Sequence, residues 1–201
     1  MNDIGIDPLF SFPVMFPKET FNLSEDKLKY ILNLERESNT NNFTSKNKFV
    51  LDDDSLKELK DWILKYVNIY CKELMKFIET EFYITQSWVN YSNFKQSHHR
   101  HKHPNSLVSG VFYLDDGDSP IVFYNSSVRF PIDVNKSSFN IYNGDSYRYK
   151  TKKNQLILFP SQLIHDVEPQ NKNKIRMSLS FNTWLKGKVG NIKTVDELNL
   201  S

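Results

Sequence analysis

The histidines of this chain are the residues best suited to chemistry, and four of the five lie within six consecutive positions. The four occur in Ser97-His98-His99-Arg100-His101-Lys102-His103, and the fifth is His165. A neutral imidazole is a good ligand for iron, zinc, copper and nickel. Side chains two residues apart on an extended strand point to the same side, so the side chain of His101 could converge on one metal ion with that of either His103 or His99. An exposed tract that binds metals without function would have the same composition.

A second candidate group lies on the segment Arg176-Met177-Ser178-Leu179-Ser180-Phe181-Asn182, in which apolar and polar residues alternate strictly. Such alternation is typical of an antiparallel strand with one face in water. A polar face inside a barrel gives the same pattern. In that case Arg176 would point inward, where a buried guanidinium needs an anion such as a carboxylate held by two hydrogen bonds. Ser178, on the same face, could add a hydroxyl donor.

The elements that position these residues change from helical to extended near residue 83. Before it, Ser24 is a plausible cap for a short helix, residues 37–50 are expected to be a loop, and a helix is predicted from about Ser55 to Thr80. After it, a period of two predicts strands at 84–94, 106–114, 120–124, 138–142, 147–150, 155–159 and 174–184. Turn residues Asp115-Asp116-Gly117-Asp118 and Asn143-Gly144 predict hairpins between neighbouring strands. We therefore expect a mainly β fold with N-terminal helices (α+β), a sandwich or jelly-roll with helices on one face.

Composition narrows the class of protein further. The 201 residues are 39% hydrophobic and suit one domain, expected over 1–201 with helical support at about 20–82 and a β core at about 83–185. A formal net charge of +2 gives no indication of nucleic acid or an anionic membrane as partner. The single Cys71 allows no internal disulfide, and the start of the chain lacks a signal-peptide pattern. We therefore expect a cytoplasmic protein.

Taken in order, these motifs resemble a known superfamily. His101-x-His103, the distant His165 and then Arg176-x-Ser178 after ten intervening residues resemble the signature of the 2-oxoglutarate/Fe(II)-dependent oxygenases. More narrowly, the chain is similar to an oxygenase family often found in marine bacteria and phages. The segments that carry this resemblance, over most of the chain, are Leu9 to Val14, Trp88-Val89-Asn90, His101 to Ser106, Ser109 to Leu114, Phe159-Pro160-Ser161 and Arg176 to Asn182.

The resemblance implies a double-stranded β-helix that encloses Fe(II), with 2-oxoglutarate as cosubstrate. It implies that His101, His103 and His165 hold the metal and that Arg176 pairs with the distal carboxylate of 2-oxoglutarate. Ser178, Tyr113 and Asn90 are weaker cosubstrate candidates, and residues 125–137 could form a lid. The implied reaction hydroxylates a small-molecule or peptide substrate and releases succinate and CO2. If a phage encodes the protein, its location would be the host cytoplasm.

One position departs from the superfamily signature, which has a carboxylate where this chain has His103. His103 could be the third ligand, it could turn away and leave the place to water, or the pair could be His99 and His101. Asp166 is expected to face away from the metal, because it neighbours His165 on an extended chain. The usual iron triad has two histidines and one carboxylate, so the departure keeps two other functions open. They are a three-histidine iron dioxygenase that does not use 2-oxoglutarate and a jelly-roll binding module without catalysis. The sequence indicates neither the substrate nor the oligomeric state.

Overall fold

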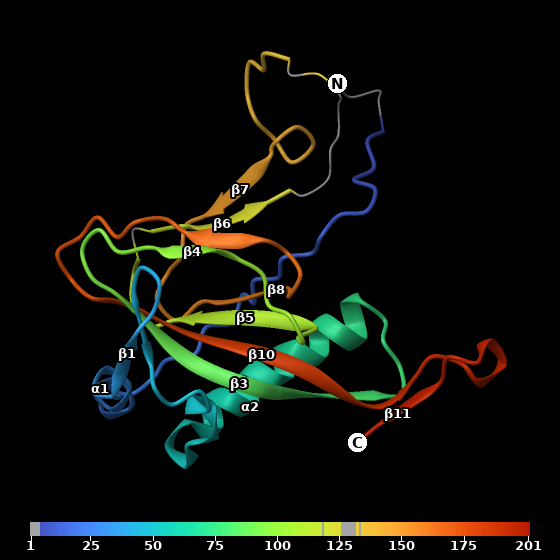
Figure 1. The fold of residues 1–201 in the computed structure, drawn as a ribbon, viewed down its shortest axis with the longest axis horizontal. Coiled ribbons are helices and arrows are strands. Elements are labelled where there is room, and N and C mark those ends of the chain that lie inside the picture. The colour runs from blue at the N-terminus through green and yellow to red at the C-terminus, as the bar shows by residue number, and fades with distance from the viewer. Residues whose placement is uncertain (1–4, 118, 126–131, 133) are drawn as a thin grey trace.

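Two antiparallel sheets face each other in this protein (Figure 1). The computed structural model describes residues 5–117, 119–125, 132 and 134–201. Within this part of the chain, sheet A has seven strands and sheet B has four. The sheets enclose the polar face of the strand that begins at Arg176, so this face lies inside the molecule.

Sheet A is built around its two longest strands, β3 (Thr80–Ser92) and β10 (Arg176–Val189). They run antiparallel, from the pair Arg176 and Ser92 to the pair Gly187 and Thr80. The strand order is β1-β2-β3-β10-β5-β8, and β11 pairs with the far end of β10. These other strands are β1 (Arg36–Ser38), β2 (Phe43–Ser45), β5 (Val108–Tyr113), β8 (Leu156–Pro160) and β11 (Leu198–Leu200).

Sheet B is smaller and carries most of the histidines. Its order is β4-β9-β6-β7, formed by β4 (His98–His101), β9 (His165–Val167), β6 (Ile121–Tyr124) and β7 (Ser146–Tyr149). In the pairing of β4 with β9, His101 lies directly opposite His165. Two segments that are far apart in sequence are thereby joined at the histidines.

The helices cover the outer face of sheet A, as Figure 1 shows for α2 (Lys57–Asn68) against β3, β10 and β5. Apolar residues of α2 recur every three or four positions and are buried against that face, among them Leu59, Ile63 and Val67. The other helical elements are α1 (Glu25–Leu32), the short turns η1 (Val50–Asp52), η2 (Asp54–Leu56) and η4 (Ile192–Thr194), and the π-helix η3 (Ile69–Leu74). None of the described helices is long and apolar enough to cross a membrane.

The helix predicted from Ser55 to Thr80 is shorter than expected. After α2 the chain continues as η3 and stops at Leu74. Lys76 then adopts a positive φ of 59°, and the N–H of Phe77 donates to the carbonyl of Cys71. A left-handed residue with such a backward hydrogen bond is a common way for a helix to end. The helix predicted after Ser24 is confirmed, since Ser24 caps α1 by accepting a hydrogen bond from the N–H of Lys27.

Two other elements were predicted wrongly. The expected loop at 37–50 contains β2 and part of β1, which form a hairpin on the edge of sheet A. These strands are short and β1 is wholly polar, so no alternation marks them. The strand expected at 138–142 is a turn instead, in which the Asn140 side chain accepts the backbone N–H groups of Tyr142 and Asn143. An asparagine that binds its own backbone in this way favours turns over strands.

Both hairpin predictions were also wrong, because the neighbouring strands pair elsewhere. The turn that begins at Asp115 follows β5 of sheet A, and the next strand, β6, belongs to sheet B. Asn143-Gly144 precedes β7, which pairs with β6 and not with a strand at 138–142. The predicted lid is largely outside the described residues, which omit 126–131 and 133, and Asp118 is outside them too. In the N-terminal segment, Met15 forms an isolated bridge to Leu158.

Candidate metal and cosubstrate site

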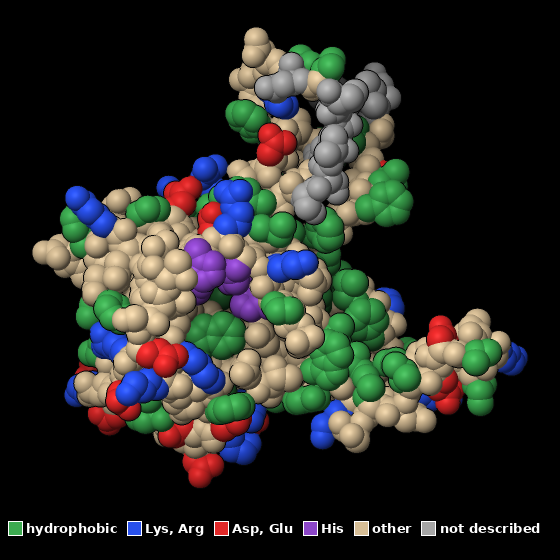
Figure 2. Space-filling model, viewed as in Figure 1, with side chains coloured by type: hydrophobic (Ala, Val, Ile, Leu, Met, Phe, Trp, Pro, Cys, Tyr) green, Lys and Arg blue, Asp and Glu red, His purple; other side chains and the backbone are tan. Residues whose placement is uncertain are grey.

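Three histidines converge between the two sheets. The ligand nitrogens of His101, His103 and His165 all lie within 4.8 Å of one another, and the Nε2 atoms of His103 and His165 are 3.3 Å apart. His101 is at the end of β4 and His165 at the start of β9. His103 is fixed just beyond β4 by its backbone N–H, which donates to the carbonyl of Ser161 at 2.9 Å. Figure 2 shows histidine side chains at the mouth of a hollow in the surface.

Two of these rings are oriented by backbone carbonyls. His165 Nδ1 is 2.8 Å from the carbonyl oxygen of Leu163, and His101 Nδ1 is 2.7 Å from that of His99. Because each Nδ1 must donate to its carbonyl, each Nε2 keeps a free lone pair. Metal-binding histidines are commonly held by such a second hydrogen bond. The geometry therefore suits nitrogen ligation.

The three rings are also neutral at ordinary pH. Burial, followed by the neighbouring His101, lowers the pKa of His165 to about 3 and that of His103 to about 4. Burial likewise lowers the pKa of His101. Metal ligation needs the unprotonated imidazole, so these shifts leave the group ready to bind a cation.

No carboxylate belongs to this histidine group among the described residues. Asp166 turns to the other side of β9, where its Oδ2 accepts hydrogen bonds from Tyr124 at 2.8 Å and from Arg100 at 3.4 Å. His103 does not turn away, and His99 belongs to a separate group with His98 and His101. The arrangement favours three histidines as ligands, and this assignment stays a prediction.

A cluster of buried polar groups lines the same cavity beside the histidines. Arg176 and Ser178 are both 3% exposed on the inner face of β10. Neighbouring strands place Asn90 and Tyr113 on either side of Ser178. The Arg176 guanidinium carbon is 5.5 Å from the centre of the Tyr113 ring. All four predicted cosubstrate residues are thereby brought together.

Several atoms of this cluster have no hydrogen-bond partner among the described residues. They include Arg176 Nε and the hydroxyl of Tyr113, whose pKa burial raises to about 12. Asn90 binds the hydroxyl of Ser180 through Nδ2 at 2.9 Å, but its Oδ1 is unpaired. Leaving buried donors without acceptors is costly, so a ligand with acceptor oxygens fits here.

Gly117 shows how closely the chain surrounds the guanidinium. A Cβ at this position would lie 2.9 Å from Arg176 Nε, and only glycine avoids this close contact because it has no Cβ. Asp115 is nearby, and burial raises the pKa of its carboxyl group. Arg176 thus lies in a tight pocket suited to a small anion such as a carboxylate.

Sequence reasoning gave no role in the site to several residues that line the cavity, among them Asn42, Trp88 and His98. The Trp88 ring centre is 5.9 Å from that of His103, and the rings of His98 and His101 stack at 4.6 Å. The two-residue spacing that links Trp88 to Asn90 on β3 was a usable signal for Trp88. Asn42 lies in a polar segment that offered none.

The comparisons with known proteins concern the family and the fold. Residues 86–182 match the model of the family described as Putative 2OG-Fe(II) oxygenase. No curated protein matches the chain. Solved structures with a similar fold include HygX from Streptomyces hygroscopicus, whose structure holds nickel, 2-oxoglutarate and hygromycin B. HygX is 10% identical to this chain, with a TM-score of 0.59, and the match covers 85% of this chain and 82% of HygX.

Two further solved structures are prolyl hydroxylases. The enzyme from Trichoplax adhaerens, in complex with a hypoxia inducible factor peptide fragment, is 15% identical with a TM-score of 0.57 over 86% and 83% of the two chains. A prolyl-4-hydroxylase from Pseudomonas putida is 12% identical with a TM-score of 0.52 over 87% and 94%. These likenesses confirm the predicted double-stranded β-helix.

Proposed function

We propose that this chain, whose residues 86–182 match the model of the Putative 2OG-Fe(II) oxygenase family, hydroxylates a substrate with oxygen and 2-oxoglutarate, releasing succinate and CO2. The match to this family model supports the expected class of enzyme and its Fe(II) and 2-oxoglutarate requirement. One observation carries the proposal: a neutral three-histidine group and a buried arginine share a single cavity.

The histidines would hold the metal. His101, His103 and His165 each offer one nitrogen, and the carbonyls of His99 and Leu163 hold two of the rings in place. Fe(II) bound there would supply the activation of oxygen. The chain's part is to leave coordination positions open, since three ligands do not fill an iron site.

The arginine end would bind the cosubstrate. The guanidinium of Arg176 would pair with the distal carboxylate of 2-oxoglutarate, and the hydroxyls of Tyr113 and Ser178 would donate to it. Burial of all three excludes water and strengthens these hydrogen bonds. The cosubstrate would thereby be oriented toward the histidines, which lie on the facing sheet.

Substrates of either kind seen in the similar structures, a small molecule or a peptide, are compatible with this site. The cytoplasmic location expected from the sequence stays a prediction, as does the single-domain organisation. Among the described residues no carboxylate belongs to the histidine group, and this favours one alternative, a three-histidine dioxygenase that does not consume 2-oxoglutarate.

Succinate formation tests the proposal without a known substrate. We expect the Fe(II)-loaded protein to convert 2-oxoglutarate slowly to succinate in air, because 2-oxoglutarate oxygenation can proceed uncoupled from substrate. The His165→Ala and Arg176→Met variants should each lose this activity. Oxygen consumption that does not depend on 2-oxoglutarate would instead support the alternative dioxygenase.

A further inference from the structure

Asn42, in the turn between β1 and β2, is a buried amide without a partner. It is 3% exposed and lines the cavity that contains the histidines. Neither Oδ1 nor Nδ2 has a hydrogen-bond partner among the described residues. Exchanging the two atoms by rotating the amide would still leave one donor and one acceptor unpaired. Burying an amide without hydrogen-bond partners costs free energy, so this amide is better explained by hydrogen bonds to a ligand than by a role in the ligand-free fold.

Asn42 lies on sheet A, away from the backbone of Arg176. Phe43 pairs with Tyr91, so Asn42 continues that register opposite Ser92, and Ser92 pairs with Arg176 on the other side of β3. Two strand spacings of about 4.8 Å place Asn42 roughly 10 Å from the Arg176 backbone. Tyr113 lies on β5, on the opposite side of β10. Asn42 therefore lies on the same sheet as the cosubstrate residues, one strand from Asn90, two strands from Arg176 and three from Tyr113.

The chemistry of 2-oxoglutarate excludes it as a hydrogen-bond partner for both polar atoms of the Asn42 amide. The cosubstrate is a dianion with acceptor oxygens and no hydrogen-bond donor, and a metal ion offers none either. It could satisfy Nδ2 but not Oδ1. A group that presents an N–H beside a carbonyl oxygen satisfies both atoms, because two planar amides can exchange a pair of N–H···O hydrogen bonds.

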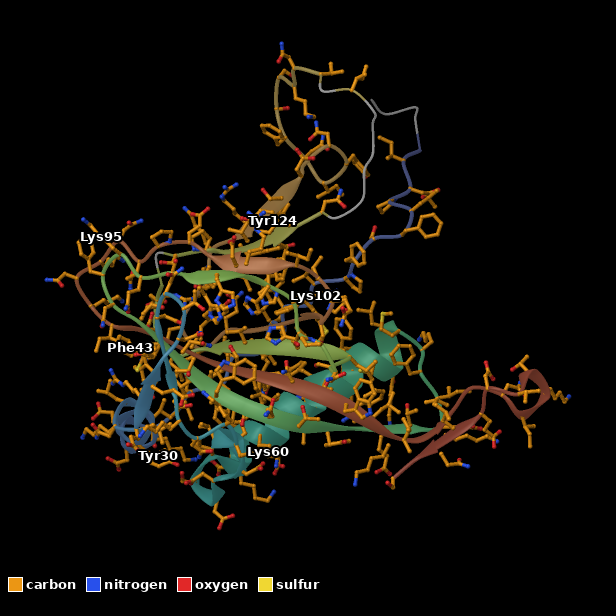
Figure 3. All side chains as sticks on the ribbon, viewed as in Figure 1. Tyr30, Phe43, Lys60, Lys95, Lys102 and Tyr124 are labelled. Atoms are coloured by element: carbon orange, nitrogen blue, oxygen red, sulfur yellow. The ribbon has the colours of Figure 1, made fainter. Side chains whose placement is uncertain are left out.

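We propose that Asn42 binds the substrate to be oxidised, and that this substrate presents an amide, such as a peptide bond or a carboxamide, to it. The surface beside Asn42 has matching chemistry. A hollow lies there between the β1–β2 turn and residues 95–97, bordered by Phe43 and Lys95, which are labelled in Figure 3. Apart from Phe43, its lining side chains are hydroxyls, amides and Lys95. Such a lining suits a substrate with polar groups better than an aliphatic substrate.

The inference rests on the proposed function for its meaning, but its test is separate. N-methylacetamide is the probe, and methyl acetate is the matched compound that lacks the N–H donor. Each is titrated into the full-length Fe(II)-loaded protein with 2-oxoglutarate under argon, and binding is followed by ligand-observed NMR. We expect N-methylacetamide to bind at least tenfold more tightly than methyl acetate. We also expect the Asn42→Ala variant to lose this preference.

Asn199→Ala serves as the control, because it makes the same truncation at an exposed position of β11 and should bind the amide as the wild type does. Equal amide binding by wild type and Asn42→Ala would overturn the proposal, as would no amide binding or equal binding of the ester. So would a fall of more than about 4 °C in the melting temperature of Asn42→Ala, since it would show that the amide has a structural partner.

The two proposals can fail independently. If the wild type binds no 2-oxoglutarate, the proposed function fails, and the same titration with metal alone still decides whether Asn42 binds an amide. If 2-oxoglutarate binds and the amide preference is absent, the inference about Asn42 fails alone.

Discussion

The two faces of the first half of β10 are both largely buried and are chemically opposite. Leu179 and Phe181 are 0% exposed toward the helices, and Arg176, Ser178 and Ser180 are between 3% and 8% exposed toward sheet B. On the apolar face the side chains pack in the main core. On the polar face, several atoms in and around the cavity have no hydrogen-bond partner among the described residues. The apolar face stabilises the fold, whereas the polar face is complete only with a ligand.

This difference gives each face its own expected response to mutation. Truncation in a packed core removes apolar contacts and leaves a cavity, so it costs stability. Truncation of an unpaired polar group removes little that the folded chain uses. Changes on the helix side should therefore alter unfolding, and changes on the cavity side should alter binding.

The largest expected effect is on metal binding by His165→Ala. Removal of one of three ligands should cost more than the roughly 10–100-fold that loss of a supporting hydrogen bond costs. Iron content after anaerobic loading and desalting should fall from about one per chain to near zero. His99→Ala is the matched control and should retain its iron. Retention by His165→Ala with loss in His99→Ala would assign the metal to the other histidine group.

Leu179→Ala should produce the next largest effect, on stability. Loss of a fully buried leucine lowers the free energy of unfolding by about 2–5 kcal/mol. Urea unfolding of the metal-free protein measures it. Ser178→Ala, on the opposite face of the same strand, should change that free energy by less than about 1 kcal/mol. Equal losses in the two variants would show that the faces do not differ in this way.

Arg176→Met should weaken 2-oxoglutarate binding and leave the iron content unchanged. A charge-assisted hydrogen-bond pair contributes about 1.5–3 kcal/mol, which corresponds to roughly 10–150-fold in affinity. Anaerobic cosubstrate titration of the iron-loaded variant measures the change. Arg176→Lys should lie between wild type and Arg176→Met, because lysine keeps the charge and loses the two-pronged geometry. Unchanged affinity in Arg176→Met would remove Arg176 from the site.

Mild acid should have the smallest effect, a loss of stability in the metal-free protein. His98, His103 and His165 have pKa values of about 3 to 4, each lowered chiefly by burial, against about 6.5 in an unfolded chain. Between these values the unfolded state binds more protons, so stability is complete above about pH 6.5 and falls as the pH drops toward 4. Urea midpoints at pH 7 and pH 6 should show the onset of this fall. The His98→Phe variant should fall less, and a pH-independent wild type would contradict the prediction.

Part of the site could be predicted from spacing, and the full set of ligands came only with the family resemblance. The interval of two residues allowed His101 to share one side of an extended segment with either His103 or His99, and the alternation after Arg176 placed Ser178 on the same face as Arg176. These patterns depend only on local geometry, which the sequence determines. The alternation does not determine whether the polar face of this strand contacts water or a cavity, because that depends on the position of the second sheet.

What could not be predicted depends on contacts between distant segments. The strands β1 and β2 carry no periodic pattern and form through pairing with each other and with β3. Asn42 enters the cavity only because that hairpin lies at the edge of sheet A. The turn residues after β5 wrongly predicted a hairpin, because the following strand joins the other sheet.

The most direct test of the central claim is an anaerobic titration of the Fe(II)-loaded protein with 2-oxoglutarate, followed in the visible spectrum. If the three histidines hold iron and Arg176 orients the cosubstrate, a weak charge-transfer band should grow and saturate at one equivalent. Iron binding without any band would contradict the account, because the polar face of β10 would then have to serve a ligand other than 2-oxoglutarate.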